Sequence, residues 1–212
     1  MRVAGRESAL CADHLLAEWV PNGQLALGGR MLKGYNTYPK TVQQPYDKRQ
    51  QQRQTLLVPF EALDDAARHL PGFAGVVQAA VAKLEADLAI RQTNQRLQLQ
   101  YAHALLQGPD SGRSSSFASH RDTDVVSKRG SPPVLYTAII KLTADEPNES
   151  ASRMHVADAQ ETFHYGPCAG DGCWFLSGLW HESLPSESRC LHLKLALFFA
   201  VVEAGLKRKQ KS

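Results

Sequence analysis

Cysteine is scarce in this 212-residue chain, which has four in all: Cys11, Cys168, Cys173 and Cys190. Their spacing matches neither the paired thiols of a zinc site nor the dense disulfide framework of a small secreted domain. The chain also lacks any apolar run that approaches the roughly 20 residues of a membrane-spanning helix. Glu7 and Asp13 interrupt the N-terminal segment, which argues against a signal peptide. We therefore expect a reduced, intracellular protein of the cytoplasm or nucleus, without membrane contact.

A large excess of charge is absent as well, because the formal net charge is only +3 at pH 7. Basic residues concentrate at Lys48, Arg49 and Arg53 and in the tail at residues 207–211. We interpret these as a solvated loop and a frayed terminus, with a polyanion contact as the alternative. The composition, 43% hydrophobic and 21% charged, is that of a globular protein with one sizeable core.

Helical periodicity marks the N-terminal part, where residues 55–90 are predicted to be helical. An apolar stripe at helical spacing consists of Val76, Val77, Ala80, Val81, Leu84 and Leu88. Such a stripe indicates packing against a sheet and carries no chemistry of its own.

From about Arg96 the hydrophobic period changes to two. Apolar and aromatic positions alternate with polar or small ones at Leu97, Leu99, Tyr101, His103 and Leu105. This pattern predicts a half-buried strand, in which His103 is interpreted as a hydrogen-bonded core histidine. Short strands at close spacing continue to residue 202. We predict one mainly β (α+β) domain: residues 1–94 as a mostly helical support, 95–202 as a jelly roll and 203–212 as a basic tail.

His120, Asp122 and His181 are the candidate metal ligands. Two imidazoles and one carboxylate on one face, with other positions open, suit iron(II) chemistry with oxygen. Residues i and i+2 of a strand point to the same side, so His120 and Asp122 are predicted to bind one metal ion together. His181 would add the third ligand from a distant strand. The alternative is a structural His120–Asp122 pair without metal, whereas His155 and His164 have no carboxylate two places on and are interpreted as sheet or loop residues.

The last predicted strand carries a candidate anion anchor. Arg189 has the parity of Leu191, Leu193, Leu195 and Leu197, and an arginine on a face that points into a core requires an anionic partner. The other face of this strand, with His192 and Lys194, is expected to be on the solvent side.

Together, His120-Arg121-Asp122 and the segment GDGCWFLSGLWHESLPSESR resemble the iron(II)- and 2-oxoglutarate-dependent dioxygenase superfamily over residues 95–202. Within it, the chain looks most like the prolyl-hydroxylase-type branch, although Arg189 follows His181 after a slightly shorter gap than usual there. The resemblance implies a double-stranded β-helix that binds Fe(II), O2 and 2-oxoglutarate, with ascorbate as an optional addition. It also implies that Arg189 anchors the far carboxylate of 2-oxoglutarate, that Tyr101 lies against that carboxylate, and that Lys141 is the rival anchor.

The activity that the resemblance implies is hydroxylation of a substrate C–H bond, coupled to decarboxylation of 2-oxoglutarate to succinate and CO2. The branch favours a peptide or protein side chain as the substrate. The alternatives are a small metabolite, a nucleic-acid base that is oxidised or dealkylated, and a cupin-like metal-binding module without oxygenase activity.

Overall fold

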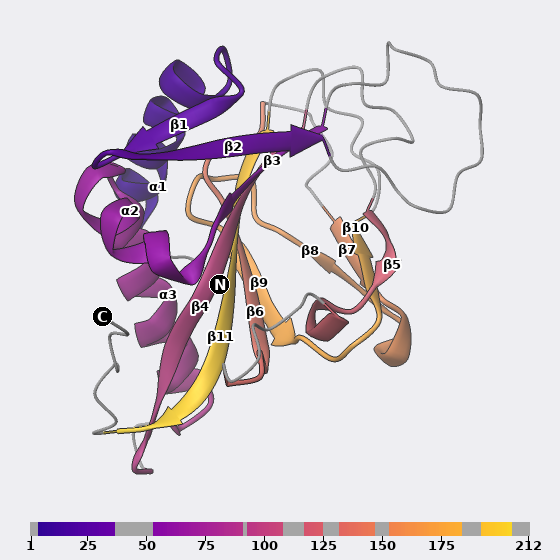
Figure 1. Ribbon diagram of the computed structural model, residues 1–212. Coiled ribbons are helices and arrows are strands. Elements are labelled where there is room, and N and C mark those ends of the chain that lie inside the picture. Colours follow the sequence, from indigo (N-terminus) through magenta and orange to yellow (C-terminus); the bar gives the residue numbers. More distant parts are fainter. Residues whose placement is uncertain are drawn as a thin grey trace.

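The computed structural model describes residues 4–36, 53–90, 93–107, 117–124, 132–146, 153–183 and 192–204. These residues form three layers: a group of helices, a large sheet and a small sheet (Figure 1). The large sheet stands in the middle, with the helices on one face and the small sheet across from the other face. No helix in the described part of the chain is long and apolar enough to span a membrane.

The large sheet has seven strands, in the order β1 (Gln24–Leu27), β2 (Arg30–Asn36), β3 (Arg53–Val58), β4 (Gln95–Gln107), β11 (His192–Glu203), β6 (Tyr136–Lys141) and β9 (Gly172–Leu176). The small sheet has four, in the order β5 (Phe117–His120), β10 (His181–Ser183), β7 (Arg153–Val156) and β8 (Glu161–His164). From β4 onward the chain crosses repeatedly between the two sheets, and the paired strands are antiparallel. This is the jelly-roll topology, so the predicted fold class is confirmed.

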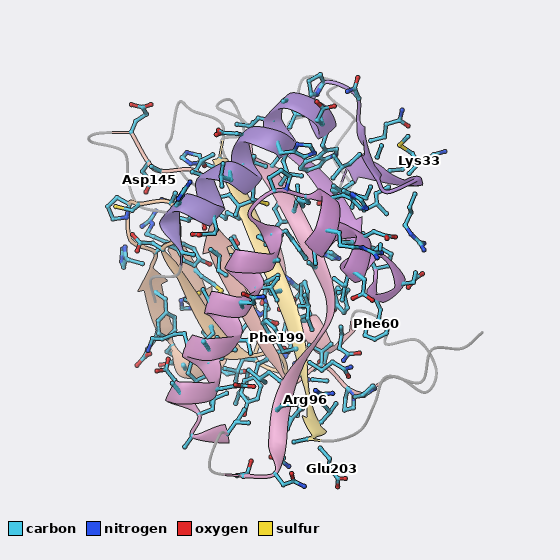
Figure 2. The ribbon with its side chains drawn as sticks, turned by 90° about the vertical axis from the view of Figure 1, so that its left-hand side faces the viewer. Lys33, Phe60, Arg96, Asp145, Phe199 and Glu203 are labelled. Atoms are coloured by element: carbon cyan, nitrogen blue, oxygen red, sulfur yellow. The ribbon has the colours of Figure 1, made fainter. Side chains whose placement is uncertain are left out.

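The longer helices are α1 (Gly5–His14), α2 (Leu63–His69) and α3 (Phe73–Asp87), and short turns are η1 (Leu15–Trp19), η3 (Phe60–Ala62), η6 (Asp122–Asp124) and η7 (Ala157–Ala159). Figure 2 views the molecule from the helical side, with Phe199 of β11 in the sheet behind α3. Val76, Ala80 and Leu84 of α3 are fully buried in the same core as Phe199. The predicted stripe therefore packs on the outside of the jelly roll, as expected.

One glycine permits the close contact between α1 and α3. Gly72, which precedes α3, has a φ of +75°, and a Cβ there would lie 2.0 Å from the backbone oxygen of Glu7. A side chain would meet both a strained backbone and a clash, so glycine is required at this position.

The helix predicted from residue 55 was wrong in its first turn, because residues 55–58 belong to β3. Strand β3 pairs with β2 on one side and β4 on the other. Leu56 and Val58 face the helices, whereas Leu57 packs toward the small sheet. Pairing with two neighbours overrides the local resemblance to a helix start. Strands β1 and β2 were also absent from the predicted elements.

The large sheet separates two hydrophobic cores. On β11, Leu193, Leu195, Leu197 and Phe199 face the helices. The alternate residues face the space between the sheets, where the inner core consists of Tyr101, Leu105, Val134, Ile139, Met154, Val156, Tyr165, Phe175, Ala196 and Phe198. His192 and Lys194 belong to this second face by parity and are 3% and 5% exposed. The expectation that they are on the solvent side was wrong, because β11 is covered on both faces.

A β-bulge in β4 changes which side chains face inward. Phe198 pairs with Tyr101 and Phe199 with Leu99, so Gln100 has no partner on β11. Leu97 and Leu99 therefore pack toward the helices, whereas Tyr101 and the alternate residues after it face the inner core. The sequence pattern had placed all of these residues on one face, which the extra residue prevents.

Candidate metal centre

His120, Asp122 and His181 come together between the two sheets. His120 ends β5 and His181 begins β10, and the two are direct partners in the register of the small sheet. The possible ligand atoms of the three side chains all lie within 4.8 Å of one another. His120 Nε2 is 3.4 Å from Asp122 Oδ1, and His181 Nε2 is 3.5 Å from Asp122 Oδ2. The sequence prediction of this group of three residues agrees with the structure.

Asp122 reaches the centre in a different way from that predicted. It is not on the strand but begins the short turn η6, after β5 has ended at His120. The backbone N–H of Asp122 donates to the carbonyl oxygen of Ser177, at 2.9 Å, which fixes the turn against the end of β9. A turn held by the large sheet, not strand alternation, brings the carboxylate beside His120.

The Thr137 hydroxyl holds the Asp122 carboxylate, and the Ser177 hydroxyl lies beside the Thr137 hydroxyl. Thr137 Oγ1 donates to Asp122 Oδ2 at 2.7 Å and lies 2.8 Å from Ser177 Oγ. Thr137 and Ser177 are 1% and 0% exposed, and Asp122 is 4% exposed. A buried carboxylate needs such donors or a cation. The carboxylate is therefore oriented before any ligand arrives.

His181 is oriented by its backbone neighbour. Its Nδ1 lies 3.0 Å from the carbonyl oxygen of Leu179, which can only accept, so Nδ1 carries the proton and Nε2 keeps its lone pair. Burial lowers the pKa of His181 below its ordinary value, against the opposing effect of Asp122. The Phe175 ring, 4.5 Å away between centroids, supports the imidazole. A neutral imidazole whose other nitrogen is hydrogen-bonded is the usual form of a metal-binding histidine.

The donor set fits a divalent metal ion of the iron type. Ligand atoms about 2.1 Å from one ion and at right angles lie about 3 Å apart, close to the separations from Asp122 to the two imidazoles. His120 has a side chain 35% exposed, so one side of the centre is open. Two imidazoles and one carboxylate with open positions suit iron(II) that also binds other molecules.

The large sheet presents three rows of side chains to the centre. The strand register gives a first row of Thr137, Phe198 and Tyr101, a second of Ile139, Ala196 and His103, and a third of Lys141, Lys194 and Leu105. Directly opposed residues of neighbouring strands share a face. Because Thr137 contacts Asp122, the first row begins at the candidate metal ligands, and the third row lies farthest from them along the strands.

Arg189 and Tyr101 were both predicted to bind an anionic co-substrate, and the structure describes only Tyr101. Arg189 lies outside the described residues, and the face assigned to it, that of Leu193 and Leu195, is directed to the helices. Tyr101 is 9% exposed and stacks on Phe198, with ring centroids 4.3 Å apart. Its hydroxyl is on the inner side of the sheet.

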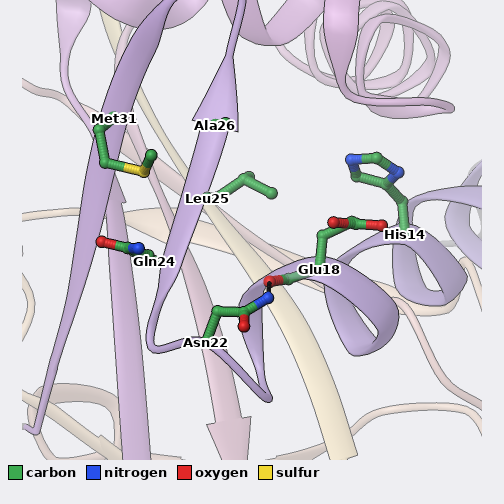
Figure 3. Close-up of a pocket in the computed structure, with 7 residues that line it drawn as sticks. All are labelled: His14, Glu18, Asn22, Gln24, Leu25, Ala26 and Met31. Carbon is green, nitrogen blue, oxygen red and sulfur yellow. Dashed lines mark hydrogen bonds between the residues drawn. The ribbon is translucent and has the colours of Figure 1, made fainter.

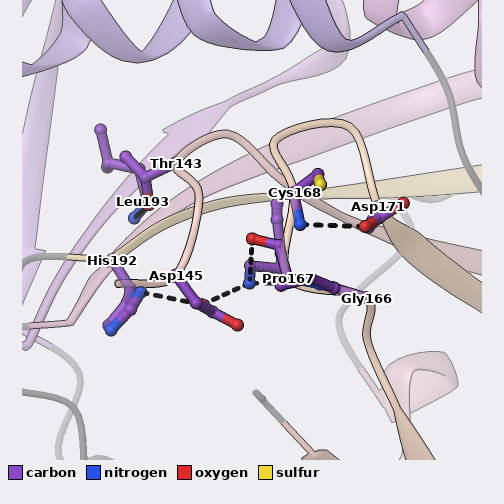
Figure 4. Close-up of polar contacts among 9 residues, drawn as sticks. Thr143, Asp145, Gly166, Pro167, Cys168, Asp171, His192 and Leu193 are labelled. Atoms are coloured by element: carbon purple, nitrogen blue, oxygen red, sulfur yellow. Dashed lines mark hydrogen bonds and ion pairs between the residues drawn. The ribbon is translucent and has the colours of Figure 1, made fainter. Parts of the chain in front are cut away.

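Lys141 already has three acceptors for its three N–H donors. It forms an ion pair with Asp145 and donates to the carbonyl oxygens of Gly166, at 3.2 Å, and Pro167, at 3.4 Å. His192 Nδ1 lies 3.6 Å from the same Asp145 carboxylate, so Asp145 stands between two basic groups (Figure 4). This buried group fastens β6 and β11 to the loops before β7 and β9.

Lys194 is a candidate anchor that the sequence analysis missed. Its ammonium lies 5.3 Å from the ring centroid of Tyr165, which is fully buried in the inner core. Burial raises the pKa of Tyr165 well above its ordinary value, and Asp122 contributes to this increase. Lys194 therefore lies beside a fully buried aromatic ring of the inner core. The alternation of residues along β11 could have pointed to Lys194, but the face that carries Lys194 was assigned to solvent.

Other polar groups stay apart from the centre. His155 and His164 lie on β7 and β8 as expected, and His155 Nδ1 is 3.3 Å from Thr162 Oγ1. A surface pocket elsewhere is lined by His14, Glu18, Asn22, Gln24, Leu25, Ala26 and Met31 (Figure 3). It contains none of the three candidate metal ligands. Among the described residues, the one group that can hold a metal ion is His120, Asp122 and His181.

Comparison with known proteins relates this fold to a class of enzymes. No protein-family model matches the chain, and no curated protein sequence matches it. Among solved structures, a Pseudomonas putida prolyl-4-hydroxylase is similar at 19% identity, over 93% of this chain and 88% of the other, with a TM-score of 0.52. The α-ketoglutarate-dependent carbocyclase SnoK from nogalamycin biosynthesis has 14% identity, coverage of 98% and 81%, and a TM-score of 0.58.

A third similar structure is a prolyl hydroxylase from Trichoplax adhaerens in complex with a peptide fragment of a hypoxia inducible factor. It has 10% identity, covers 92% of this chain and 78% of the other, and has a TM-score of 0.54. The chain therefore has the double-stranded β-helix fold of iron- and 2-oxoglutarate-dependent oxygenases. The resemblance predicted from the sequence is confirmed at the level of the fold and of the His-Asp-His group.

Proposed function

We propose that this protein is an iron(II)- and 2-oxoglutarate-dependent oxygenase that hydroxylates a C–H bond. The observation that carries the proposal is the group of His120, Asp122 and His181 inside a double-stranded β-helix, with Asp122 and His181 buried and His120 partly exposed. Iron(II) with 2-oxoglutarate and O2 supplies an oxidation that yields succinate and CO2 together with the oxidised substrate. Ascorbate is not needed for this assignment.

The protein's own contribution is to hold the metal ion and to orient its ligands. His120 and His181 offer imidazole nitrogens, and Asp122 offers a carboxylate that Thr137 keeps in place. The inner core around Phe175 and Phe198 limits the access of water to the buried side of the centre. No acid or base catalyst beyond the metal ligands is required.

We propose that Lys194 anchors the far carboxylate of 2-oxoglutarate. Lys194 and Phe198 share the inner face of β11, and four residues of strand correspond to about 13 Å. A five-carbon dicarboxylate bound to the metal and the extended lysine side chain together can bridge that distance. Ala196 lies between them on the same face and has the smallest side chain of the second row, which leaves room for the co-substrate.

Lys141 is fastened by contacts within the protein, and Lys194 borders the inner core. The three N–H donors of Lys141 are engaged by Asp145, Gly166 and Pro167. Lys194 is 5% exposed and lies over the Tyr165 ring, within the inner core that also contacts His181. Arg189 remains the anchor expected from the sequence, and the two predictions exclude each other.

A peptide or protein side chain is the proposed substrate. Support comes from the similarity to the Trichoplax adhaerens prolyl hydroxylase, which was solved with a peptide fragment. The similarity to SnoK makes a small molecule the second candidate, because SnoK is a carbocyclase of nogalamycin biosynthesis.

The test measures succinate formed from 2-oxoglutarate with Fe(II) and oxygen, together with the binding of Mn(II) as an inert substitute for iron. We expect one metal ion per chain in the wild type, and loss of both metal binding and turnover in His120→Ala and His181→Ala. His164→Ala, which removes an exposed histidine of β8, is the control. Full metal occupancy in both ligand variants would refute the assignment.

Measurements of 2-oxoglutarate binding distinguish the three candidate anchor residues. Loss of one partner of a buried charge pair costs about 2–5 kcal/mol, so Lys194→Ala should weaken 2-oxoglutarate binding about 30-fold or more. Normal binding by Lys194→Ala with weak binding by Arg189→Ala would assign the role to Arg189 instead. The same comparison with Lys141→Ala tests the third possibility.

A further inference from the structure

His103 is a polar residue on the metal-facing side of the large sheet that the proposed chemistry does not use. On β4 it pairs with Ala196 of β11 and Leu57 of β3. It therefore belongs to the second row of side chains, one step along the strand from Tyr101 and Phe198. The β-bulge at Gln100 is what gives His103 this orientation, since it sets the face of every residue that follows in β4.

Two aromatic rings hold the His103 imidazole. Its centroid lies 5.1 Å from Phe198, in an edge arrangement, and 5.5 Å from Tyr101. Tyr101 and Phe198 stack on each other and are 9% and 3% exposed. His103 itself is partly exposed. The stack is thus a buried support, and His103 is the least buried side chain of this group.

The imidazole has unused hydrogen-bonding capacity. Within the described part of the chain, neither ring nitrogen of His103 has a hydrogen-bond partner, and neither is among the polar atoms that are fully shielded from solvent. The prediction that His103 is a hydrogen-bonded core histidine was therefore wrong. A polar group on an apolar inner face usually has a partner, either in the protein, in water or in a ligand.

The charge state of His103 limits what this ligand can be. Burial lowers the pKa of His103 to about 4, although Asp122 acts in the opposite direction. A neutral imidazole has one donor and one acceptor. Phe198, Ala196 and Ile139 of the first two rows and Leu57 of β3 are apolar, and Thr137 and Tyr101 of the first row carry uncharged hydroxyl groups. A neutral imidazole offers no opposite charge to a charged substrate group, whereas it can both donate to and accept from an uncharged one.

We propose that His103 is a substrate-binding residue that recognises an uncharged amide or hydroxyl group of the substrate beside the candidate metal centre. This inference rests on the proposed function and adds to it the chemistry of the substrate. An amide and a hydroxyl both donate and accept, which matches the two ring nitrogens. A peptide backbone is one source of such a group, and a hydroxylated ring compound is the other.

The experiment uses full-length protein with Fe(II), 2-oxoglutarate and oxygen. Two sets of uncharged compounds are screened for their ability to increase succinate formation above the substrate-free rate: blocked proline-containing peptides and hydroxylated polycyclic ring compounds. The set that stimulates the wild type identifies the source of the amide or hydroxyl. Kinetic constants for the best compound are then measured in His103→Leu, His103→Asn and the control His164→Leu.

We expect His103→Leu to raise KM for that compound about tenfold or more, with a smaller change in kcat, because one buried hydrogen bond is lost. His103→Asn should recover most of the loss, since an amide side chain also donates and accepts. His164→Leu should behave as the wild type. Recovery by asparagine distinguishes hydrogen bonding from a merely structural role.

Equal KM values in wild type and His103→Leu would overturn the inference, and so would failure of asparagine to recover binding. A wild-type protein that forms succinate but responds to no compound of either set would overturn the proposed substrate chemistry. Absence of any succinate from the iron-loaded wild type would instead refute the proposed function itself.

Discussion

Thr137→Val is the substitution that tests the metal centre without touching a ligand. Valine keeps the β-branched shape of threonine but loses the hydroxyl that donates to Asp122 Oδ2 at 2.7 Å and lies 2.8 Å from Ser177 Oγ. A hydrogen bond to a charged group contributes about 1.5–3 kcal/mol. That range corresponds to a factor of about 10–100 in affinity, which is the usual effect of removing a group that orients a metal ligand.

The assay is a titration of the metal-free protein with Mn(II) at pH 7, monitored by calorimetry. Thr137→Val should bind Mn(II) about 10–100 times more weakly than the wild type. The matched control is Thr162→Val, at an exposed position of β8, which is the edge strand of the small sheet opposite β5. A wild-type affinity in a correctly folded Thr137→Val protein would show that the hydroxyl does not orient the carboxylate.

Three further results are expected. Ala196→Leu should weaken 2-oxoglutarate binding about tenfold or more in calorimetry, because the added side chain fills the space between Phe198 and Lys194. Leu84→Ala should lower the free energy of unfolding in urea by about 2–5 kcal/mol, because Leu84 is fully buried against the large sheet. The low pKa of His103, about 4, makes the folded protein less stable as the pH falls below 6.5, because the unfolded chain takes up the proton first. Between pH 7 and pH 5 the wild type should therefore lose about 1–2 kcal/mol more stability than His103→Leu, measured by urea unfolding at both pH values.

The sequence was most informative where the chemistry is local. His120 and Asp122 are two residues apart, so the turn after β5 brings them together even though the expected strand geometry was wrong. The stripe on α3 was equally readable, because helical spacing alone decides which face is buried. In both cases the signal does not depend on how distant strands pair.

The sequence was misleading where strand pairing decides which face of the sheet a side chain occupies. Alternation along residues 97–105 carries no sign of the extra residue at Gln100, which depends on the partner strand β11. The inward face of β11 likewise could not be chosen from its pattern, because leucine on one side and lysine, alanine and phenylalanine on the other are all buried. A strand covered on both faces has no solvent side from which to fix parity. This is the physical reason that Lys194 was assigned to solvent and His103 to an ordinary core.

The residues that form the candidate metal centre come from both sheets. Both histidines belong to the small sheet, whereas Thr137 and Ser177, which hold Asp122, belong to or directly follow strands of the large sheet. Asp122 lies in the turn between them and is bonded to both its hydroxyl partner and the Ser177 carbonyl. The three ligands can therefore meet in the observed geometry only after the sheets have packed against each other. Metal affinity should then report on sheet packing as well as on the ligands, because an ion that binds only the folded arrangement stabilises it by mass action.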